Sequence, residues 1–181
     1  MRLFVATDLP HALLEKITEV ESEFRKVTNS MRWVRPSSMH LTLKFLGDVA
    51  ESRVPLIDAH LRAIHVEPFQ VNYYGVGFFP NARVPRVLSV GVSSEALEDL
   101  AHKVEERMVE LDFLGEKRQF RPHLTMARIG RDNQINHSLI ETAARYADRK
   151  FGVYATDRFY LFHSILRTDG AEHQKLFEYP L

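Results

Sequence analysis

The sequence contains two copies of a four-residue pattern, His-apolar-Thr-apolar, at residues 40–43 and 123–126. In a β-strand, alternate side chains share a face. Each copy therefore places an imidazole and a hydroxyl on one side and two apolar side chains on the other. The pattern predicts two strands that are anchored in a core and that present a His and a Thr on an open face.

This pair of residue types could carry out proton transfer at phosphorus. A neutral imidazole can take a proton from water while a protonated one gives a proton to a leaving oxygen, because histidine titrates near neutral pH. Threonine hydroxyls can donate hydrogen bonds to the non-bridging oxygens, on which charge accumulates. We therefore expect His40 and His123 to be catalytic, and Thr42 and Thr125 to bind the substrate.

Three basic residues flank the motifs and are further candidates for substrate binding. By strand parity, Lys44 shares a face with the first motif histidine, and Arg121 shares a face with the second. Arg128 has the opposite parity and would reach the open face only across a β-bulge. For each of the three, a solvated surface position is the competing interpretation.

Other interpretations of the motifs carry less weight. A single His-x-Thr tripeptide is common by chance, so the information lies in its repetition. Metal binding fits poorly, because a histidine pair without a third ligand does not make a usual zinc site. The other histidines are predicted to be surface or structural residues: His11, His60, His65, His102, His137, His163 and His173. Four aromatic residues could stack on bases but are better explained as core: Trp33, Tyr73, Phe78 and Phe79.

Composition limits the possible classes of protein. The 181 residues, of which 45% are hydrophobic, fit one domain or two small lobes with a shared core. With 24 basic and 24 acidic residues, electrostatic wrapping of nucleic acid is not expected, although a local basic cleft is compatible. The chain has no cysteine, so disulfides and thiolate chemistry are excluded. No apolar run of about 20 residues and no signal-peptide pattern is found, and we expect a cytoplasmic protein.

Hydrophobic periodicity predicts an α+β fold with two sheets. Helices are expected at about residues 10–27, 52–65, 95–115 and 136–146. Strands are expected at about residues 3–7, 31–34, 39–46, 69–79, 86–92, 122–129, 152–166 and 174–179, with a hairpin at 69–92. The motif strands occupy roughly corresponding places in this order, which suggests an internal duplication.

The surroundings of the motifs resemble a known family. The segments that carry the resemblance are MRLFVA (1–6), RWV (32–34), HLTLKFLG (40–47), GFFP (77–80) and PHLTMAR (122–128). They are similar to those of the RNA 2′,3′-cyclic phosphodiesterases, also called 2′-5′ RNA ligases, of the 2H phosphoesterase superfamily. The resemblance extends from residue 1 to the closing Tyr-Pro-Leu at 179–181.

The resemblance implies one domain over residues 1–181, with two intertwined lobes that each supply one motif. In such a fold, two antiparallel sheets form a concave cleft and the helices pack outside. The implied reaction is the metal-independent and cofactor-independent hydrolysis of an RNA 2′,3′-cyclic phosphate to a 2′-phosphomonoester. By the same resemblance, His40 is the proton donor to the ribose 3′ oxygen and His123 the acceptor from water. The expected partners are RNA ends with a cyclic phosphate, among them tRNA halves, or nucleotides. We expect a monomer, and the resemblance implies that it would also join tRNA halves reversibly without ATP.

Two functions of other classes remain open from the residues alone. A module that binds RNA ends without turnover would keep a basic cleft but would not need both histidines. A metal-dependent phosphodiesterase would lose its activity in EDTA, whereas a two-histidine enzyme would keep it.

Overall fold

The structure, a computed structural model, describes residues 1–130, 135–167 and 170–181 of the chain. The helices are α1 (His11–Arg25), α2 (Val54–Arg62), α3 (Glu95–Val109) and α4 (His137–Arg145), with short 3-10 turns at Pro36–Ser38 and Glu51–Arg53. The strands are β1 (Arg2–Thr7), β2 (Met31–Trp33), β3 (Leu41–Asp48), β4 (Phe69–Phe79), β5 (Val87–Ser93), β6 (His123–Ile129), β7 (Lys150–Thr156), β8 (Arg158–Arg167) and β9 (Gly170–Pro180). None of these helices is long and apolar enough to cross a membrane.

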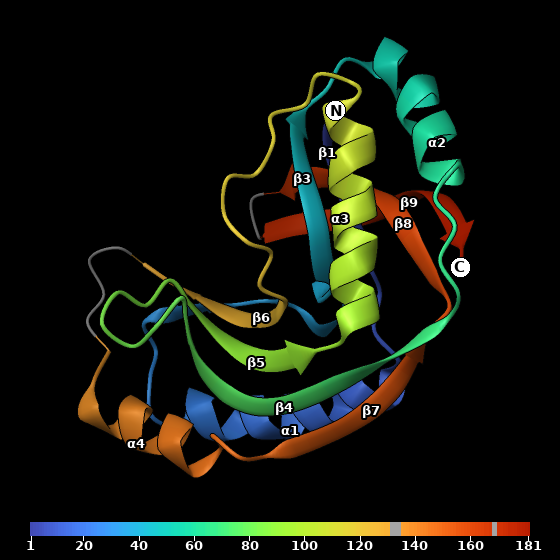
Figure 1. Ribbon diagram of the computed structural model, residues 1–181. Helices are drawn as coiled ribbons and strands as arrows, with labels where there is room; N and C mark the ends of the chain where they lie inside the picture. Colours follow the sequence, from blue (N-terminus) through green and yellow to red (C-terminus); the bar gives the residue numbers. More distant parts are fainter. Residues whose placement is uncertain (131–134, 168–169) are drawn as a thin grey trace.

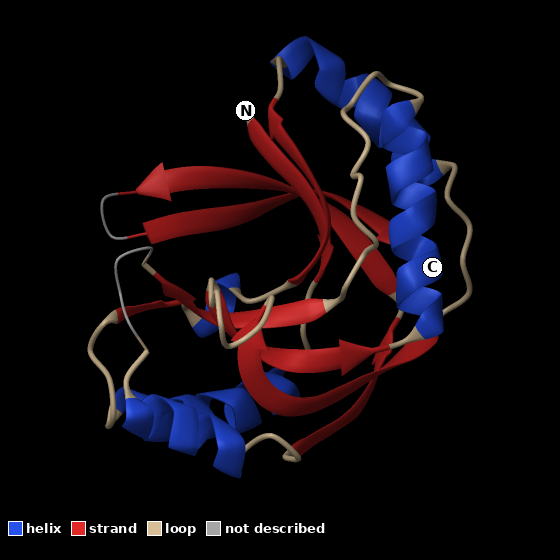
Figure 2. Cartoon of the chain, turned by 60° about the vertical axis from the view of Figure 1, so that its left-hand side comes forward, coloured by secondary structure: helices blue, strands red, loops and turns tan. Residues whose placement is uncertain are grey.

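The strands form two antiparallel sheets, as the sequence predicts. The four-stranded sheet has the order β3-β1-β8-β9, and the five-stranded sheet has the order β2-β6-β5-β4-β7. Helices α2 and α3 pack beside β3 and β9, whereas α1 and α4 pack against β4 and β7 (Figure 1). In Figure 2 the helices form two groups on the outside of the strands. Each sheet therefore has one face covered by helices, and each sheet carries one of the two motifs.

The helices form because their apolar residues recur every three or four positions and face the sheets. In α3, the buried stripe is Leu97, Leu100, Ala101, Val104 and Met108. The Ser94 hydroxyl accepts a hydrogen bond from the N–H of Leu97 and caps this helix. The helix ends at Val109, earlier than Gly115, because Asp112 takes the left-handed conformation with φ of 60° and turns the chain.

The C-terminal part of the chain contains one strand more than the periodicity predicts. The apolar run expected as a single strand at 152–166 is divided at Asp157 into β7 and β8, which belong to different sheets. The last strand also begins earlier than residue 174, at Gly170. Because β8 and β9 return to β1, the C-terminus completes the sheet that the N-terminus begins.

A second, small aromatic cluster lies on the uncovered face of the four-stranded sheet. It consists of Phe4, Ala6, Tyr160 and Phe162, and it is separate from the main core. Along β1, Leu3 and Val5 point into the main core, so that Phe4 must point the other way. This uncovered aromatic face surrounds the first motif.

Candidate active site

The apolar residues of both motifs are anchored in the core. Leu41, Leu43, Leu124 and Met126 are all buried, which confirms the face assignment made from strand parity. His40 lies immediately before β3, and His123 is the first residue of β6. Both histidines are partly exposed on the uncovered faces of their sheets.

Each catalytic candidate is held by the same backbone contact. The Nδ1 atom of His40 lies 2.8 Å from the carbonyl oxygen of Ser38, and that of His123 lies 2.9 Å from the carbonyl oxygen of Arg121. A carbonyl only accepts hydrogen bonds, so Nδ1 must carry the proton in both rings. The Nε2 atom of each ring is therefore left for proton transfer.

The two threonines of the motifs leave their hydroxyls available. Thr42 and Thr125 are half-buried on the same faces as the histidines. Within the described part of the chain, neither hydroxyl has a hydrogen-bond partner. Both can therefore donate to a bound anion, and their role in substrate binding stays a prediction.

Aromatic rings and a third histidine surround His40. Its ring centroid lies 4.7 Å from that of Phe4 and 6.0 Å from that of Phe162. The ring of His173, on β9, packs edge-on against it at 5.1 Å and 87°. The Nδ1 atom of His173 is buried and has no hydrogen-bond partner among the described residues.

The ring of His123 stacks on that of Phe79 on the uncovered face of the five-stranded sheet. Its ring is nearly parallel to that of Phe79, with centroids 3.9 Å apart and an angle of 11°. The guanidinium of Arg121 lies over the Phe79 ring, 5.2 Å from its centroid. Phe79 therefore does not belong to the core, contrary to our expectation, whereas Tyr73 is buried as expected.

The surroundings lower the pKa of both catalytic candidates. Burial lowers the pKa of His40 from 6.5 to about 4, and the nearby charges of His173 and Arg128 act in the same direction. Burial also lowers the pKa of His123, with Arg121 and Arg128 contributing. Arg128 is thus a cause that the two shifts have in common. Without substrate, both rings are neutral at neutral pH.

A β-bulge in β3 removes Lys44 from this site. Val5 pairs with Lys44 and Ala6 pairs with Thr42, so Leu43 is an extra residue and the alternation shifts by one. Lys44 consequently points toward the helices. Its Nζ atom lies 2.7 Å from a carboxylate oxygen of Glu105 and 3.0 Å from the carbonyl oxygen of Leu114. The expectation that Lys44 faces the substrate is wrong, because parity was counted without the bulge.

A matching bulge in β6 brings Arg128 to the open face. Leu88 pairs with Ala127 and Ser89 pairs with Thr125, so Met126 is the extra residue. Ala127 is buried and Arg128 is exposed. The bulge that the sequence required for Arg128 is therefore present, and Arg128 faces the same side as Thr125.

A hollow of about 650 Å³ begins beside His123 and runs along β4 and β5. Small residues line its floor, among them Gly77, Ser89 and Gly91, and Phe79 and Arg121 form part of its wall. Glycine is required at one of these positions, since a Cβ at Gly91 would lie 2.6 Å from a backbone oxygen of Tyr74. The hollow has the volume of a small-molecule site.

Two residues that contact the motif histidines, His173 and Phe4, were not found from the sequence. Neither belongs to a motif, and His173 is brought to His40 only through the pairing of β9 with β8, where it lies opposite Ser164. The described residues bring no three His, Cys, Asp or Glu side chains together in a way that could hold a metal ion. Independence of metal stays a prediction that chelation can test.

Comparison with known proteins identifies the family. The family described as LigT like Phosphoesterase matches twice, over residues 8–89 and 90–171, which agrees with the predicted duplication. An RNA 2′,3′-cyclic phosphodiesterase of Archaeoglobus fulgidus is 35% identical over 177 residues, covering 97% of this chain and 98% of that protein. One of Methanocaldococcus jannaschii is 28% identical and covers 99% and 100%.

Solved structures show the same fold. The protein TT0787 of Thermus thermophilus superposes with a TM-score of 0.85 at 29% identity, covering 100% of this chain and 98% of that one. E. coli LigT, solved in complex with 3′-AMP, superposes with a TM-score of 0.80 at 24% identity, covering 99% and 97%. Because the family matches over both halves of the chain, and the fold has the same two antiparallel sheets, the chain belongs to the LigT-like phosphoesterase family.

Proposed function

We propose that this protein hydrolyses the 2′,3′-cyclic phosphate at an RNA end to a 2′-phosphomonoester. The observation that carries the proposal is the pair of imidazoles, each with Nδ1 anchored on a carbonyl and Nε2 left for chemistry. The names of the relatives from A. fulgidus and M. jannaschii support the substrate class. The presence of 3′-AMP in the E. coli LigT structure shows that a protein of the same fold binds a nucleotide.

In the mechanism that we propose, Nε2 of His123 takes a proton from water, whose oxygen attacks phosphorus. The bond from phosphorus to the ribose 3′ oxygen breaks, and Nε2 of His40 gives its proton to that oxygen. The products are a 2′-phosphate and a 3′-hydroxyl, and exchange of protons with solvent restores both rings. The assignment of His40 as donor and His123 as acceptor is taken from the family resemblance. The backbone contacts of the two rings are equivalent and do not distinguish the two roles.

Binding of the substrate favours the protonated form of His40, which must act as the acid. In the free protein His40 is neutral at neutral pH, since its pKa is about 4. A bound phosphate anion favours the charged form of a neighbouring imidazole and raises its pKa. Arg128, Thr42 and Thr125 would meanwhile hold the non-bridging oxygens. No step requires a metal ion.

The joining of RNA ends through a 2′-5′ linkage without ATP would use the same groups in the same direction. A 5′-hydroxyl takes the place of the attacking water, and His123 takes its proton. The hollow beside His123 favours this second activity, because its 650 Å³ lies on the side from which water attacks and could hold a nucleoside.

The test is incubation of the purified protein with an oligoribonucleotide that ends in a 2′,3′-cyclic phosphate, with and without EDTA. We expect a 2′-phosphate product in both samples, which 31P NMR distinguishes from a 3′-phosphate. Binding without turnover would favour the RNA-binding module. Activity lost in EDTA and restored by a divalent metal would favour the metal-dependent enzyme. The variants His40→Ala and His123→Ala serve as inactive controls.

A further inference from the structure

Two arginines lie directly opposite each other at the edge of the five-stranded sheet. In the pairing of β2 with β6, Arg32 is the partner of Arg128. Residues paired in this way project from the same face of a sheet, so Arg32 faces the same side as Arg128. The neighbours of Arg32 on β2 confirm the orientation, since Met31 is buried and Trp33 is covered by the guanidinium of Arg25 at 4.6 Å.

This arrangement is unfavourable unless an anion binds there. Like charges directly opposite each other on neighbouring strands destabilise a sheet. Both side chains are exposed, and within the described part of the chain neither Arg32 nor Arg128 forms a salt bridge. A bound phosphate would relieve the repulsion, because guanidinium groups bind phosphate through paired charge-assisted hydrogen bonds.

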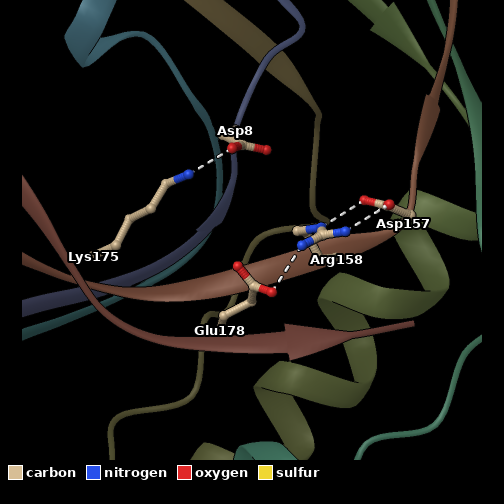
Figure 3. Close-up of polar contacts among 5 residues, drawn as sticks. All are labelled: Asp8, Asp157, Arg158, Lys175 and Glu178. Carbon is tan, nitrogen blue, oxygen red and sulfur yellow. Dashed lines mark hydrogen bonds and ion pairs between the residues drawn. The ribbon is translucent and has the colours of Figure 1, made fainter.

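The rim of the four-stranded sheet has the opposite character. There, Lys175 pairs with Asp8 at 2.6 Å, and Arg158 pairs with Asp157 at 2.9 Å and with Glu178 at 2.8 Å (Figure 3). The net charge of zero is thus distributed unevenly: basic residues are neutralised on this rim, whereas the two arginines at the β2 edge are not. An RNA backbone would therefore approach the site over β2 and β6.

Building on the proposed function, we propose that Arg32 binds the phosphodiester immediately 5′ of the terminal cyclic nucleotide. Arg128 is exposed on the face of β6 that carries Thr125, because of the bulge at Met126, and is placed there for the cyclic phosphate. Arg32, one strand farther out, is placed for the next phosphate of the same RNA strand. The preferred substrate is then an RNA chain end and not a free cyclic nucleotide.

The experiment compares adenosine 2′,3′-cyclic phosphate with a trinucleotide that ends in the same cyclic adenosine. We measure kcat/KM for both at several salt concentrations. For the unchanged protein we expect a higher kcat/KM for the trinucleotide, with a steeper decrease as salt rises. For Arg32→Ala we expect the ratio of trinucleotide to mononucleotide to fall about threefold to fivefold, as for one exposed ion pair. The slope of log kcat/KM against log salt for the trinucleotide should decrease by about 0.7.

Arg107→Ala is the matched control. Arg107 lies on α3, pairs with Glu110 at 3.3 Å, and changes the net charge by the same amount when removed. It should leave the ratio and the salt slope unchanged. Equal kcat/KM for the two substrates in the unchanged protein, or an Arg32→Ala variant with unchanged ratio and slope, would overturn the inference and leave the proposed function intact. Failure to hydrolyse either substrate would refute the proposed function, and this inference with it.

Discussion

Lowering the pH should destabilise the free protein through His40 more than through an ordinary histidine. An imidazole in an unfolded chain has a pKa of about 6.5, whereas burial lowers the pKa of folded His40 to about 4. Between these two values the unfolded state binds more protons than the folded state, so stability rises with pH. The contribution of neutral His40 to the free energy of unfolding is complete above pH 6.5 and is lost as the pH falls toward 4.

The size of this effect follows from the two pKa values. At pH 5, the unfolded histidine is almost fully protonated and folded His40 is almost fully neutral. The difference is at most about 2 kcal/mol of unfolding free energy. His173 and His123 also have lowered pKa values and contribute in the same direction. A comparison of variants is therefore needed to isolate His40.

The assay is chemical denaturation of the unchanged protein and of His40→Gln at pH 7.5 and pH 5.0. The unchanged protein should lose up to about 2 kcal/mol more than the variant between these pH values. In parallel, an NMR titration of His40 should give a midpoint near 4, and inorganic phosphate should raise that midpoint. A midpoint near 6.5, or equal losses in the two proteins, would refute the reasoning.

Four further predictions concern single residues of the site. His40→Ala and His123→Ala should each reduce the single-turnover rate by ~10²–10⁴-fold, and the double variant should lose far less than the product of the two effects. Thr42→Val and Thr125→Val should have smaller effects, up to ~10²–10³-fold and partly in KM, and larger losses than those of the histidine variants would contradict the assigned roles. Arg128→Ala should raise the pKa of both His40 and His123, because its charge lowers both, and unchanged NMR midpoints would show that it does not face them. Lys44→Met should reduce the free energy of unfolding, measured by denaturation, by roughly 1–3 kcal/mol, because Glu105 loses its ion pair with Lys44. The KM for the cyclic phosphate should stay unchanged.

Local sequence patterns predicted the parts of the fold that depend on local physics. The apolar stripe of α3 and its Ser94 cap depend on neighbours within one or two turns. The division of the strand at Asp157 could not be predicted in this way. Both flanking segments have strand-like composition. The break arises because β7 pairs with β4 in one sheet whereas β8 pairs with β1 in the other.

The site was predicted to the extent that strand parity holds. His40, Thr42 and their counterparts in β6 lie before the bulges, so that counting by two placed them correctly. Lys44 and Arg128 lie after the bulges, and their faces depend on a register that is set by the partner strands. His173 was missed for a related reason, because its contact with His40 arises from the β8–β9 pairing.

The two bulges also explain how a duplicated scaffold acquires two unlike halves. Because both occur one residue after the threonine, Phe45 and Arg128 occupy equivalent positions, five residues after their histidines. One half thus presents an exposed aromatic ring beside the Phe4 cluster, and the other presents a cation. Acid–base catalysis needs one neutral and one protonated group at the same time, and identical surroundings would give both imidazoles the same pKa. The repeated backbone places the two rings alike, and their neighbours differ, because His173 lies against His40 whereas Arg121 lies beside His123.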